Sequence, residues 1–501
     1  MTPEVETVII GAGISGIGAG IELLRRGHSS FALLEAASGV GGTWRDNTYP
    51  GVAVDIPSAS YCFSFETDYY WSRTFATGAE IQRYISHCAD KYDVTAHIRY
   101  RSRAVRSQFD STTDTWTTQL DDGTAVASRY LIAATGLFGE PVWPSIPGLD
   151  TFGGKAMHTG RWDHTHDLML KRVAVIGTGA SAVQVIPEIA PLVKELRVFQ
   201  RTPIWIGPRL DSPSRPNSRL SMRRFAVIRK LQRLVSESGL EFLTFSIVNY
   251  RALPFIVRAV QRFIRVLMRR QVNDRETAQR LLPGYGLGCK RPAISNRYLP
   301  AFNRENVRLV TQPIARICPE GIVTDDHTVH EVDTIILATG FLTTQQGNAP
   351  TFEVVGRDEL ELGQFWTEHR RQAYAGVSVP GFPNFFLTAG PYSGGFNWFA
   401  MLEANLAHIM MCIDGARSRG VTRVEVRRDA HESYMRHMWQ RAGGTVFKDR
   451  SCATANSYYV DRFDDPSLPL PHTPWWRVIR GRREGTRGYR FGAPASPERA
   501  A

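Results

Sequence analysis

Two stretches of the chain share one order of hydrophobic and polar positions. Each has a short apolar run, then apolar residues at helical spacing, then a second apolar run; these are residues 7–37 and 172–203. A short apolar run between turn residues is typical of a buried parallel strand, and a 3.6-residue period indicates a helix that packs on it. The pattern predicts an α/β fold with two Rossmann-like dinucleotide-binding domains in tandem.

The first stretch carries a dinucleotide-binding fingerprint. Gly11, Gly13 and Gly16 form G-x-G-x-x-G between the predicted strand and helix. The first glycine permits the tight turn, the second lets a pyrophosphate approach the backbone, and the third lets the helix pack closely. Glu35 ends the second apolar run, where a carboxylate accepts a hydrogen bond from a ribose hydroxyl. This unit predicts an FAD-like site.

The second stretch repeats the fingerprint with one telling change. Gly177, Gly179 and Ala182 take the three positions, and Arg201 stands where the first unit has its acid. A guanidinium pairs with phosphate through two hydrogen bonds, so Arg201 favours the 2′-phosphate of NADP. A solvated surface arginine is the alternative interpretation of this residue.

Each unit is followed by an apolar strand that delivers Ala-Thr-Gly, in residues 130–141 and 333–342. The first of these places Thr135 and Gly136 where a bare backbone can lie against a cofactor. Two dinucleotide folds in tandem describe a flavoprotein in which hydride passes from a nicotinamide to the flavin.

Composition narrows the class of protein. The chain has 501 residues and a formal net charge of +12, and its six cysteines include no C-x-x-C pair. Scattered cysteines argue against a disulfide framework, a thiol redox centre or a metal site, and they fit a reducing cytosol. The N-terminus enters a strand directly, and no uncharged run reaches the roughly 18 residues of a spanning helix, so we expect no signal peptide and a cytoplasmic location.

Much of the positive charge lies in a segment that interrupts the second unit. Residues 219–272 hold twelve Arg or Lys and two Glu, without a nucleic-acid motif. The pattern predicts helices, with Arg258, Arg262, Arg265 and Arg269 on one face. Apolar side chains take mainly the other face, namely Phe255, Ile256, Val260, Phe263, Ile264 and Leu267. Two interpretations stay open, a solvated face of a packed helix and peripheral contact with an anionic membrane.

Between the two units, residues 151–163 follow neither a helix nor a strand period. This connector holds a motif that matches F-x-G-x-x-x-H-x-x-x-W-[P/D], namely Phe152, Gly154, His158, Trp162 and Asp163. A second motif, G-G-x-W-x-x-x-x-[F/Y]-P-G-x-x-x-D, follows the first unit as Gly41, Gly42, Trp44, Tyr49, Pro50, Gly51 and Asp55. With these motifs the chain resembles the class B flavoprotein monooxygenases of the type I Baeyer–Villiger family. The resemblance covers nearly the whole chain and is weakest over 212–287 and beyond 460.

The resemblance implies a domain plan. The FAD-binding domain would comprise residues 1–145 and 345–501, and residues 146–163 would form the linker with the fingerprint. The NADP-binding domain would comprise residues 164–211 and 286–344, and residues 212–285 would form a helical insert flanking the substrate site.

The resemblance also implies a reaction. NADPH reduces FAD, O₂ adds to the reduced flavin as a C4a-peroxide, and attack on a small lipophilic ketone gives an ester or lactone. Oxidation of sulfur or nitrogen, or hydroxylation, by the same flavin chemistry is the alternative. A non-oxygenating flavin reductase or oxidase is a remote third, and a disulfide reductase would need a cysteine pair near the flavin. Oligomeric state is left open.

Roles for individual residues follow from the same resemblance. Arg291 would be the catalytic arginine over the flavin, Asp55 would hold and tune it, and Lys290 would join Arg201 and Thr202 on the 2′-phosphate. The remaining FAD contacts would be Ser15, Gly42, Thr43, Trp44 and Tyr61. The remaining NADP contacts would be Thr178, Ala180, Ser181 and Gln184. Surface cations are the alternative for Lys290 and Arg291, and core packing is the alternative for Tyr61.

In the linker, His158 and Trp162 are interpreted as latches between the two domains. A histidine can hydrogen-bond a backbone group, and a tryptophan can bury its ring and donate its N–H. The glycines Gly153, Gly154 and Gly160 are expected to absorb dihedral changes when the domains rotate.

Overall fold

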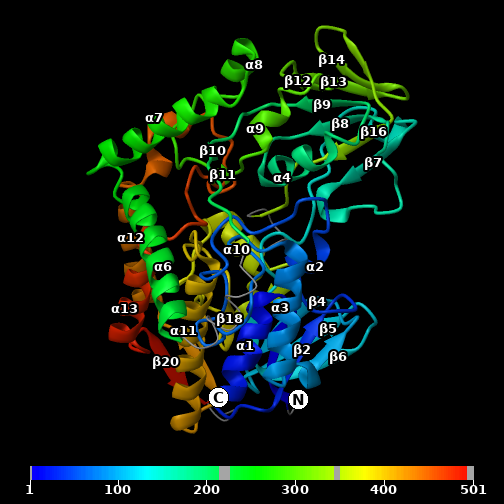
Figure 1. Cartoon of the computed structure of the whole chain (residues 1–501). Coiled ribbons are helices and arrows are strands. Elements are labelled where there is room, and N and C mark those ends of the chain that lie inside the picture. The colour runs from blue at the N-terminus through cyan, green and yellow to red at the C-terminus, as the bar shows by residue number, and fades with distance from the viewer. Residues whose placement is uncertain (1–2, 214–225, 344–349, 494–501) are drawn as a thin grey trace.

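The computed structural model describes residues 3–213, 226–343 and 350–493. In Figure 1 one sheet lies in the lower half of the molecule and a second in the upper half. The helices α6 (Ala226–Val248) and α7 (Pro254–Arg270) stand beside them on the left. This arrangement confirms the predicted α/β class with two Rossmann-like units.

The lower sheet contains the strands of the first predicted unit. Its order is β17-β4-β5-β6-β1-β2-β3, and β18 pairs with β6 as a branch. The strands are β1 (Val5–Ile10), β2 (Phe31–Glu35), β3 (Ile98–Tyr100), β4 (Ala104–Asp110), β5 (Thr115–Leu120), β6 (Ala125–Ala133), β17 (Glu353–Val355) and β18 (Phe385–Leu387). Because β1 runs parallel to both β2 and β6, its carboxyl end opens between two crossover connections, which is where such sheets bind ligands.

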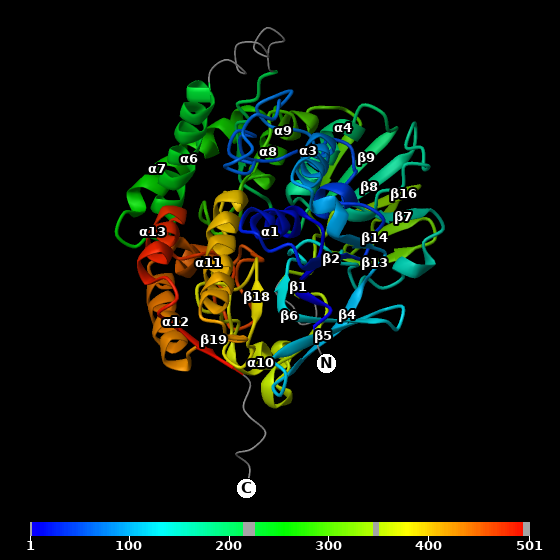
Figure 2. The ribbon, with the colours of Figure 1, turned by 90° about the horizontal axis from the view of Figure 1, so that it is seen from below.

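Helices cover this sheet on both sides. They are α1 (Ile14–Arg25), α2 (Thr43–Asp46), α3 (Gly78–Lys91), α10 (Leu362–His369), α11 (Trp398–Ser418), α12 (Arg428–Ala442) and α13 (Pro474–Glu484). The packing of α1 explains its glycines, since a Cβ on Gly16 would lie 1.8 Å from the carbonyl oxygen of Gly11. On the outer side of α1, the absence of a side chain at Gly18 lets this helix approach Phe63 and also Leu406, which belongs to α11. α1 and α11 lie side by side in Figures 1 and 2.

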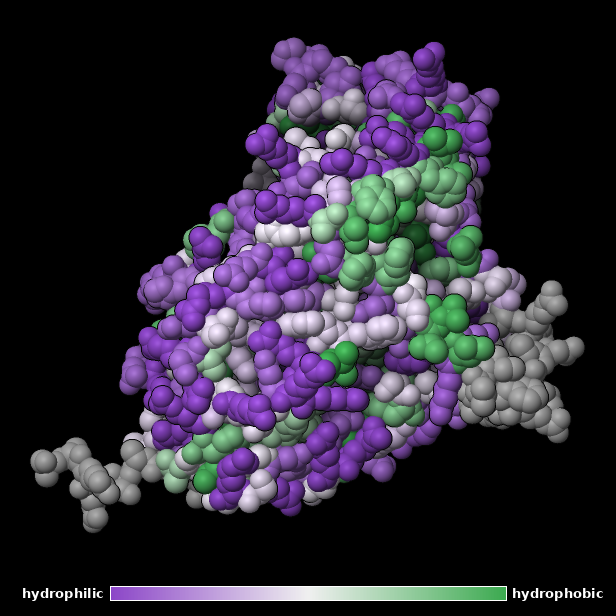
Figure 3. Space-filling view, turned by 90° about the vertical axis from the view of Figure 1, so that its left-hand side faces the viewer, coloured by the Kyte–Doolittle hydropathy of each residue, from purple (hydrophilic) through white to green (hydrophobic). Residues whose placement is uncertain are grey.

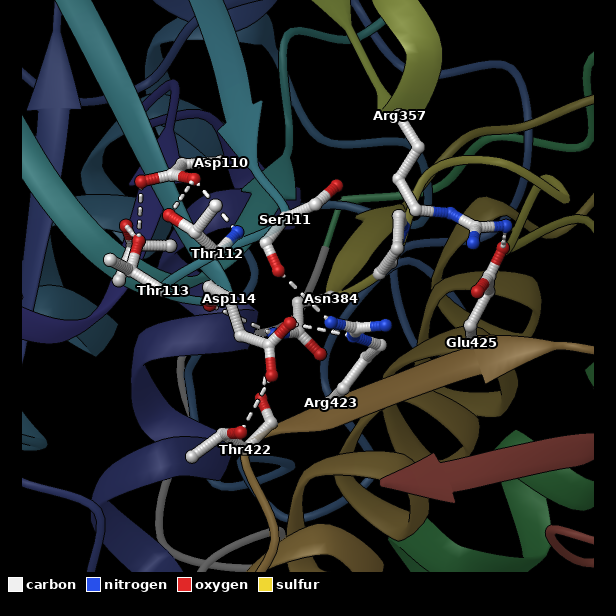
Figure 4. Close-up of polar contacts among 12 residues, drawn as sticks. Asp110, Ser111, Thr112, Thr113, Asp114, Arg357, Asn384, Thr422, Arg423 and Glu425 are labelled. Carbon is white, nitrogen blue, oxygen red and sulfur yellow. Dashed lines mark hydrogen bonds and ion pairs between the residues drawn. The ribbon is translucent and has the colours of Figure 1, made fainter. Parts of the chain in front are cut away.

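A buried aspartate ties a small C-terminal sheet to the lower sheet. That small sheet consists of the antiparallel strands β19 (Arg423–Val426) and β20 (Tyr489–Gly492). Asp114, at the turn between β4 and β5, accepts hydrogen bonds from Arg423 Nε at 2.6 Å and from Thr422 Oγ1 at 2.7 Å (Figure 4). Asn384 donates from Nδ2 to the Thr422 carbonyl at 2.9 Å. Because the Asp114 side chain is fully buried, loss of its cationic partner would cost about 3–5 kcal/mol.

The upper sheet is entirely parallel, in the order β12-β9-β8-β16-β7. Its strands are β7 (Lys155–His158), β8 (Arg172–Ile176), β9 (Glu195–Phe199), β12 (Val307–Val310) and β16 (Thr334–Leu337), and α4 (Ala180–Ile189) and α9 (Tyr298–Ala301) pack against it. Two small sheets flank it, one of β10 (Ile206–Gly207) and β11 (Ala293–Ile294), and one of β13 (Ile314–Cys318), β14 (Gly321–Thr324) and β15 (Val329–Glu331).

The connector is more regular than its pattern predicts. Lys155–His158 form β7, the edge strand beside β16, and the short helices η2 (Leu149–Thr151) and η3 (Thr159–Arg161) flank it. Because an edge strand pairs with only one other strand, its alternation of hydrophobic and polar residues along the sequence is weak. The role expected of the linker glycines in domain rotation stays a prediction, and the packing shows a separate reason for two of them. A Cβ on Gly154 would lie 2.4 Å from the Asp333 carbonyl oxygen, and one on Gly160 would lie 2.8 Å from the Phe341 ring. These glycines allow close approach.

The insert is helical, as predicted, with α6, α7 and α8 (Arg275–Arg280). α7 has the predicted basic side and a largely apolar opposite side, but only part of the apolar side is buried. Val257, Ile264 and Met268 are buried, whereas Phe255 and Phe263 are 65% and 61% exposed and share the outer face with the exposed arginines. Arg219 to Arg224 of the predicted basic segment lie outside the described residues. No helix in the described ranges is long and apolar enough to cross a bilayer.

Two of the chain crossings between the halves are hydrogen-bonded to each other. The Val142 N–H donates to the Gly340 carbonyl, and the Leu342 N–H donates to the Glu140 carbonyl, both at 2.9 Å. The crossing out of the lower sheet and the crossing back to it therefore form one short antiparallel ribbon.

Candidate active site

A cavity of about 1660 Å³ lies between the two sheets. Most residues that the sequence proposes as cofactor contacts line it. From the first unit these are Gly11, Gly13, Ser15, Glu35, Gly42, Thr43, Trp44, Asp55, Tyr61, Thr135 and Gly136. From the second they are Gly177, Thr178, Gly179, Ala180, Ser181, Gln184, Arg201, Thr202, Lys290 and Arg291.

The proposed residues that do not line this cavity fall into two groups. Gly16 and Ala182, the third positions of the two fingerprints, are buried where helix and strand pack together. The linker residues Phe152, Gly154, His158, Trp162 and Asp163 lie outside it, although their neighbour Arg161 does line it.

The first glycine turn has the form that a dinucleotide needs. Gly11 has φ +104, and a Cβ there would lie 2.7 Å from the Ala134 carbonyl oxygen. Gly13 and Gly42 face each other, so a Cβ on either would fill the space between them. Glu35 is held at the end of β2, because its oxygens accept hydrogen bonds from the N–H groups of Ala12 at 2.7 Å and Ala37 at 2.8 Å. This cradle fits the pyrophosphate and ribose of FAD.

The second turn repeats this geometry. Gly177 has φ +118, and a Cβ there would lie 2.4 Å from the Ala338 carbonyl oxygen, whereas the space beside Gly179 is open. Thr178 Oγ1 donates to the Thr202 carbonyl at 2.6 Å, which fixes the loop that carries Arg201.

Two cations converge on this loop. Burial lowers the pKa of Lys290, and the nearby charge of Arg201 lowers it further. In the part of the chain that the structure describes, neither cation has an acidic partner within an ion-pair distance. A pair of like charges at one edge of a cavity fits a ligand with two negative charges, such as the 2′-phosphate of NADP.

Arg291 is the most constrained cation of the cavity. Its Nε and Nη2 donate to the two carboxylate oxygens of Asp55 at 2.6 and 2.7 Å. Burial alone would lower the pKa of Arg291, but the Asp55 carboxylate outweighs burial and raises the pKa well above its usual value. About a quarter of the side chain, 24%, stays accessible, and its guanidinium carbon lies 5.5 Å from the centre of the Phe396 ring.

Aromatic side chains form another part of the cavity wall. Trp44 Nε1 donates to the Tyr61 hydroxyl at 3.0 Å, and the Tyr61 ring lies edge-on to Phe399. Burial raises the pKa of Tyr61. Tyr49 donates to Gln184 Oε1 at 2.9 Å, which links the second motif to α4 of the upper half. Tyr61 thus contributes both to the core and to the cavity wall.

His158 is fully buried in the upper half. Its Nδ1 accepts a hydrogen bond from the Gly160 N–H at 3.0 Å, so Nε2 carries the proton in the neutral ring. Burial lowers its pKa to about 4, although the adjacent Gly340 backbone partly offsets this lowering. Its ring lies edge-on to Phe341. His158 therefore contacts the return crossing between the halves.

Three cavity residues escape the sequence interpretation because they lie in the C-terminal segment. Asn456 Nδ2 donates to Thr202 Oγ1 at 3.0 Å, and Tyr458 and Tyr459 line the cavity beside Arg291. The adjacent tyrosines were the available signal, but two aromatic residues in a row are equally typical of a core.

The expectation of unpaired cysteines is wrong for one pair. Cys289 and Cys452 form a disulfide across a sequence separation of 163 residues, while the other four cysteines are free and buried. Spacing could not reveal this pair, because the fold alone brings the two segments together. The pair is not a C-x-x-C hairpin, and its first cysteine directly precedes Lys290 and Arg291.

Comparisons with known proteins agree with this geometry. The profile of the family described as pyridine nucleotide-disulphide oxidoreductase matches residues 8–233. A Baeyer–Villiger monooxygenase of Pseudomonas aeruginosa is 35% identical over 458 residues, which cover 91% of this chain and 85% of that protein. Another, of Streptomyces coelicolor, is 36% identical over 464 residues, covering 91% and 87%. The chain belongs to the Baeyer–Villiger monooxygenase family.

Solved structures extend the likeness to the whole fold of this Baeyer–Villiger enzyme. Oxidized steroid monooxygenase bound to NADP superimposes with a TM-score of 0.86 at 29% identity, over 98% of this chain and 99% of the other. An OTEMO complex with FAD and NADP gives 0.86 at 28% identity, over 98% and 100%. The open form of cyclohexanone monooxygenase gives 0.85 at 29% identity, also over 98% and 100%. The protein is an FAD- and NADPH-dependent flavin monooxygenase, and the alternative of a disulfide reductase is excluded.

Proposed function

We propose that this monooxygenase inserts one oxygen atom of O₂ beside the carbonyl group of a small lipophilic ketone, with Arg291 as its catalytic residue. The observation that carries the proposal is the bidentate pair of Arg291 with Asp55 in the wall of the shared cavity. Bound FAD supplies oxygen activation and bound NADPH supplies the hydride.

Arg291 stabilises the negative charge that develops on oxygen during the transfer. A guanidinium stays charged at every working pH and donates in a fixed plane, and its hold on Asp55 orients that plane. The N–H groups that Asp55 does not take are left available on the side chain, which lines the cavity. Tyr458, Tyr459 and Phe396 keep water away from this cation, which strengthens its field.

The cofactors are held by the two glycine turns. Glu35 binds the ribose of FAD, and Trp44 and Tyr61 pack against its ring system. Arg201, Lys290 and Thr202 bind the 2′-phosphate of NADPH, which supports the preference over NADH. The N-terminus of α11 points into the cavity through Gly394, Gly395 and Trp398, where its dipole favours negative charge on the flavin.

The linker adjusts the two halves between hydride delivery and oxygen transfer. His158 acts by position, because its low pKa keeps it neutral and its ring abuts Phe341 on the return crossing. We expect His158→Ala to slow flavin reduction and to divert NADPH into hydrogen peroxide. Unchanged reduction and unchanged product yield would contradict the proposal.

The insert gives this enzyme a membrane-facing surface from which the substrate enters. Exposed apolar side chains occur on this side of the molecule, and Figure 3 shows hydrophobic residues there in separate patches with hydrophilic and neutral residues between them. They come from α6, α7 and α13, namely Leu231, Leu234, Val235, Phe242, Phe245, Phe255, Val260, Phe263, Val266, Trp475 and Ile479. Arg258, Arg262, Arg269 and Arg270 are exposed among them on α7.

This mixture suits the interface of an anionic bilayer, where aromatic rings enter the headgroup layer and arginines pair with phosphates. Two observations connect the surface to the site. Thr244, Ile247 and Val248, near the end of α6, line the cavity. Near its middle, α6 contacts the FAD half, since Ser60 Oγ donates to Ser236 Oγ at 2.7 Å.

Turnover in ¹⁸O₂ with NADPH and a set of ketones of rising hydrophobicity tests the proposed reaction. We expect one ¹⁸O atom in the new ester or lactone, with activity rising with hydrophobicity. Label found only in sulfoxides or N-oxides when sulfides and amines are offered would favour the alternative. Consumption of NADPH with hydrogen peroxide as the sole product would overturn both.

A further inference from the structure

We propose that the Cys289–Cys452 disulfide positions Lys290 and Arg291, and that its loss uncouples NADPH oxidation from oxygen transfer. The inference deepens the proposed function and rests on it, since it concerns the same arginine. It arises from where the crosslink lies in the cavity wall.

The three residues that carry both cations, 290–292, form a short bridge with a fixed point at each end. Beyond them, β11 is pinned to β10, and the Ala293 N–H donates to the Trp205 carbonyl at 2.9 Å. Before them, Cys289 is 1% exposed in the core of the upper half and is bonded to Cys452. The bridge therefore cannot slide along the cavity while the disulfide is intact.

Cys452, the partner cysteine, holds the chain segment on the opposite side of the cavity. Cys452 ends the short helix η6 (Arg450–Cys452), and a few residues later Asn456 binds Thr202 and the two tyrosines reach Arg291. One covalent bond thus sets the distance between the segment that bears the catalytic cation and the segment that shields it from water. Asp55 fixes only the guanidinium end of Arg291, from the other half of the molecule.

Loss of the crosslink leaves the fold in place, because weaker contacts also join these segments. The Gly286 N–H donates to the Ser451 carbonyl at 3.4 Å, and the Arg251 N–H donates to the Gly444 carbonyl at 3.0 Å. Val446, Phe447, Ala455 and Tyr459 share a core with Cys289. The expected change is a displacement of the bridge by a fraction of an ångström to about 1 Å, a misplacement that can reduce a reaction by up to about 100-fold.

The reduction is a two-electron step. A dithiol such as dithiothreitol breaks the Sγ–Sγ bond, each sulfur gains one electron and one proton to become a thiol, and the reagent closes to its cyclic disulfide. Hydrogen peroxide released by an uncoupled enzyme reverses the step, since two thiols and one peroxide give the disulfide and two waters. The uncoupled state would thus produce the oxidant that restores coupling.

The test uses the FAD-loaded full chain, prepared without reductant. Peptide mapping under non-reducing conditions should find the Cys289–Cys452 crosslink. Cys289→Ser with Cys452→Ser, and separately wild-type enzyme treated with dithiothreitol, should form several-fold less product per NADPH and more hydrogen peroxide. Their KM for NADPH should rise and their melting temperature should fall by only a few degrees. Cys318→Ser, at a buried free cysteine of β13, is the matched control and should behave as wild type.

Two results would overturn the proposal. One is alkylation of both cysteines in the untreated enzyme; the other is wild-type coupling in the double variant. Dithiothreitol should have no further effect on the double variant, and an equal effect there would assign the loss to another target. If oxidised wild type oxygenates no ketone, the proposed function fails, but the KM for NADPH and the rate of flavin reduction still report whether the crosslink positions the bridge.

Discussion

Arg291 and Asp55, 236 positions apart in sequence and in different halves of the molecule, share two parallel hydrogen bonds of 2.6 and 2.7 Å. The carboxylate belongs to the lower half and the guanidinium to the upper half. In the proposed mechanism, Arg291 is therefore oriented for oxygen transfer only when both halves are in register.

Replacing Arg291 separates the two half-reactions. Arg291→Ala should bind FAD and accept hydride from NADPH almost normally, while oxygenation falls by at least about 100- to 1000-fold, the usual cost of losing a preorganised charge contact. Arg291→Lys keeps the charge without the planar fork and should recover only part of the loss. Rapid-mixing absorbance measures reduction, and product analysis measures oxygenation. Loss of FAD from the alanine variant would give Arg291 a structural role instead.

Asp55→Asn tests the other partner. The amide keeps the size and one acceptor but removes the charge that raises the pKa of Arg291, so the guanidinium loses its orienting ion pair. We expect oxygenation to fall by about 10- to 100-fold, with a smaller effect on reduction. A variant at Asp46, which pairs with Arg45 near the same cavity, is the control. Equal losses at both positions would indicate a general effect of acid removal.

Cofactor preference depends on Arg201. Arg201→Ala should raise the KM for NADPH by about 10- to 100-fold, the value of a charge-assisted hydrogen bond, and should leave the KM for NADH nearly unchanged. Arg308→Ala, on exposed β12, should alter neither. Steady-state kinetics with NADPH and with NADH measures the two KM values. Parallel increases in both KM values would refute contact with the 2′-phosphate.

His158 makes stability depend on pH. Its pKa falls from 6.5 in the unfolded chain to about 4 in the folded one, so between these values the unfolded state binds the extra proton. Its contribution is fully present above pH 6.5 and is lost as the pH falls toward 4, in total about 3 kcal/mol. His158→Asn, which keeps an acceptor for Gly160, should flatten this part of the profile in urea unfolding. The same slope in the variant would assign the dependence to other groups, and exposed His327→Asn is the control.

The proposed membrane contact would depend on Phe255 and Phe263 of α7. Phe255→Ser with Phe263→Ser should weaken binding to anionic vesicles by roughly 100- to 10,000-fold, since each of the two rings contributes about 1.5–3 kcal/mol on burial. Leu170→Ser, at an equally exposed apolar residue of the upper half, should change nothing. Co-sedimentation at several salt concentrations measures binding. Absence of wild-type binding at low salt would refute the proposed surface.

The sequence predicts the cofactor frame well because that frame follows from local rules. Gly11 and Gly177 have positive φ in tight turns where a Cβ would collide with a carbonyl oxygen, so no other residue serves there. Arg201 and Glu35 follow from the fixed length of a β–α–β unit. The strands and helices around these residues can be predicted from short-range hydrophobic patterns alone.

The rest depends on contacts between distant segments. β7 takes its form from β16, 179 positions further on, and the disulfide joins segments that the pattern never relates. Tyr458 and Tyr459 reach the cavity because the C-terminal segment crosses to the upper half. On α7, Phe255 and Phe263 are exposed because Val257, Ile264 and Met268 form the buried side. A helical period can identify a face, but only packing decides which face is buried.

The ribbon of hydrogen bonds at Val142 and Leu342 limits how the two halves can move. Two separate peptide strands would each bend and twist on their own, but strands joined by two hydrogen bonds bend as one. Such a ribbon flexes easily across its flat side and resists motion in its plane, so at this crossing the backbone favours rotation about one axis. In the proposed function, this stretch of backbone would help to set the path along which the nicotinamide returns to the flavin.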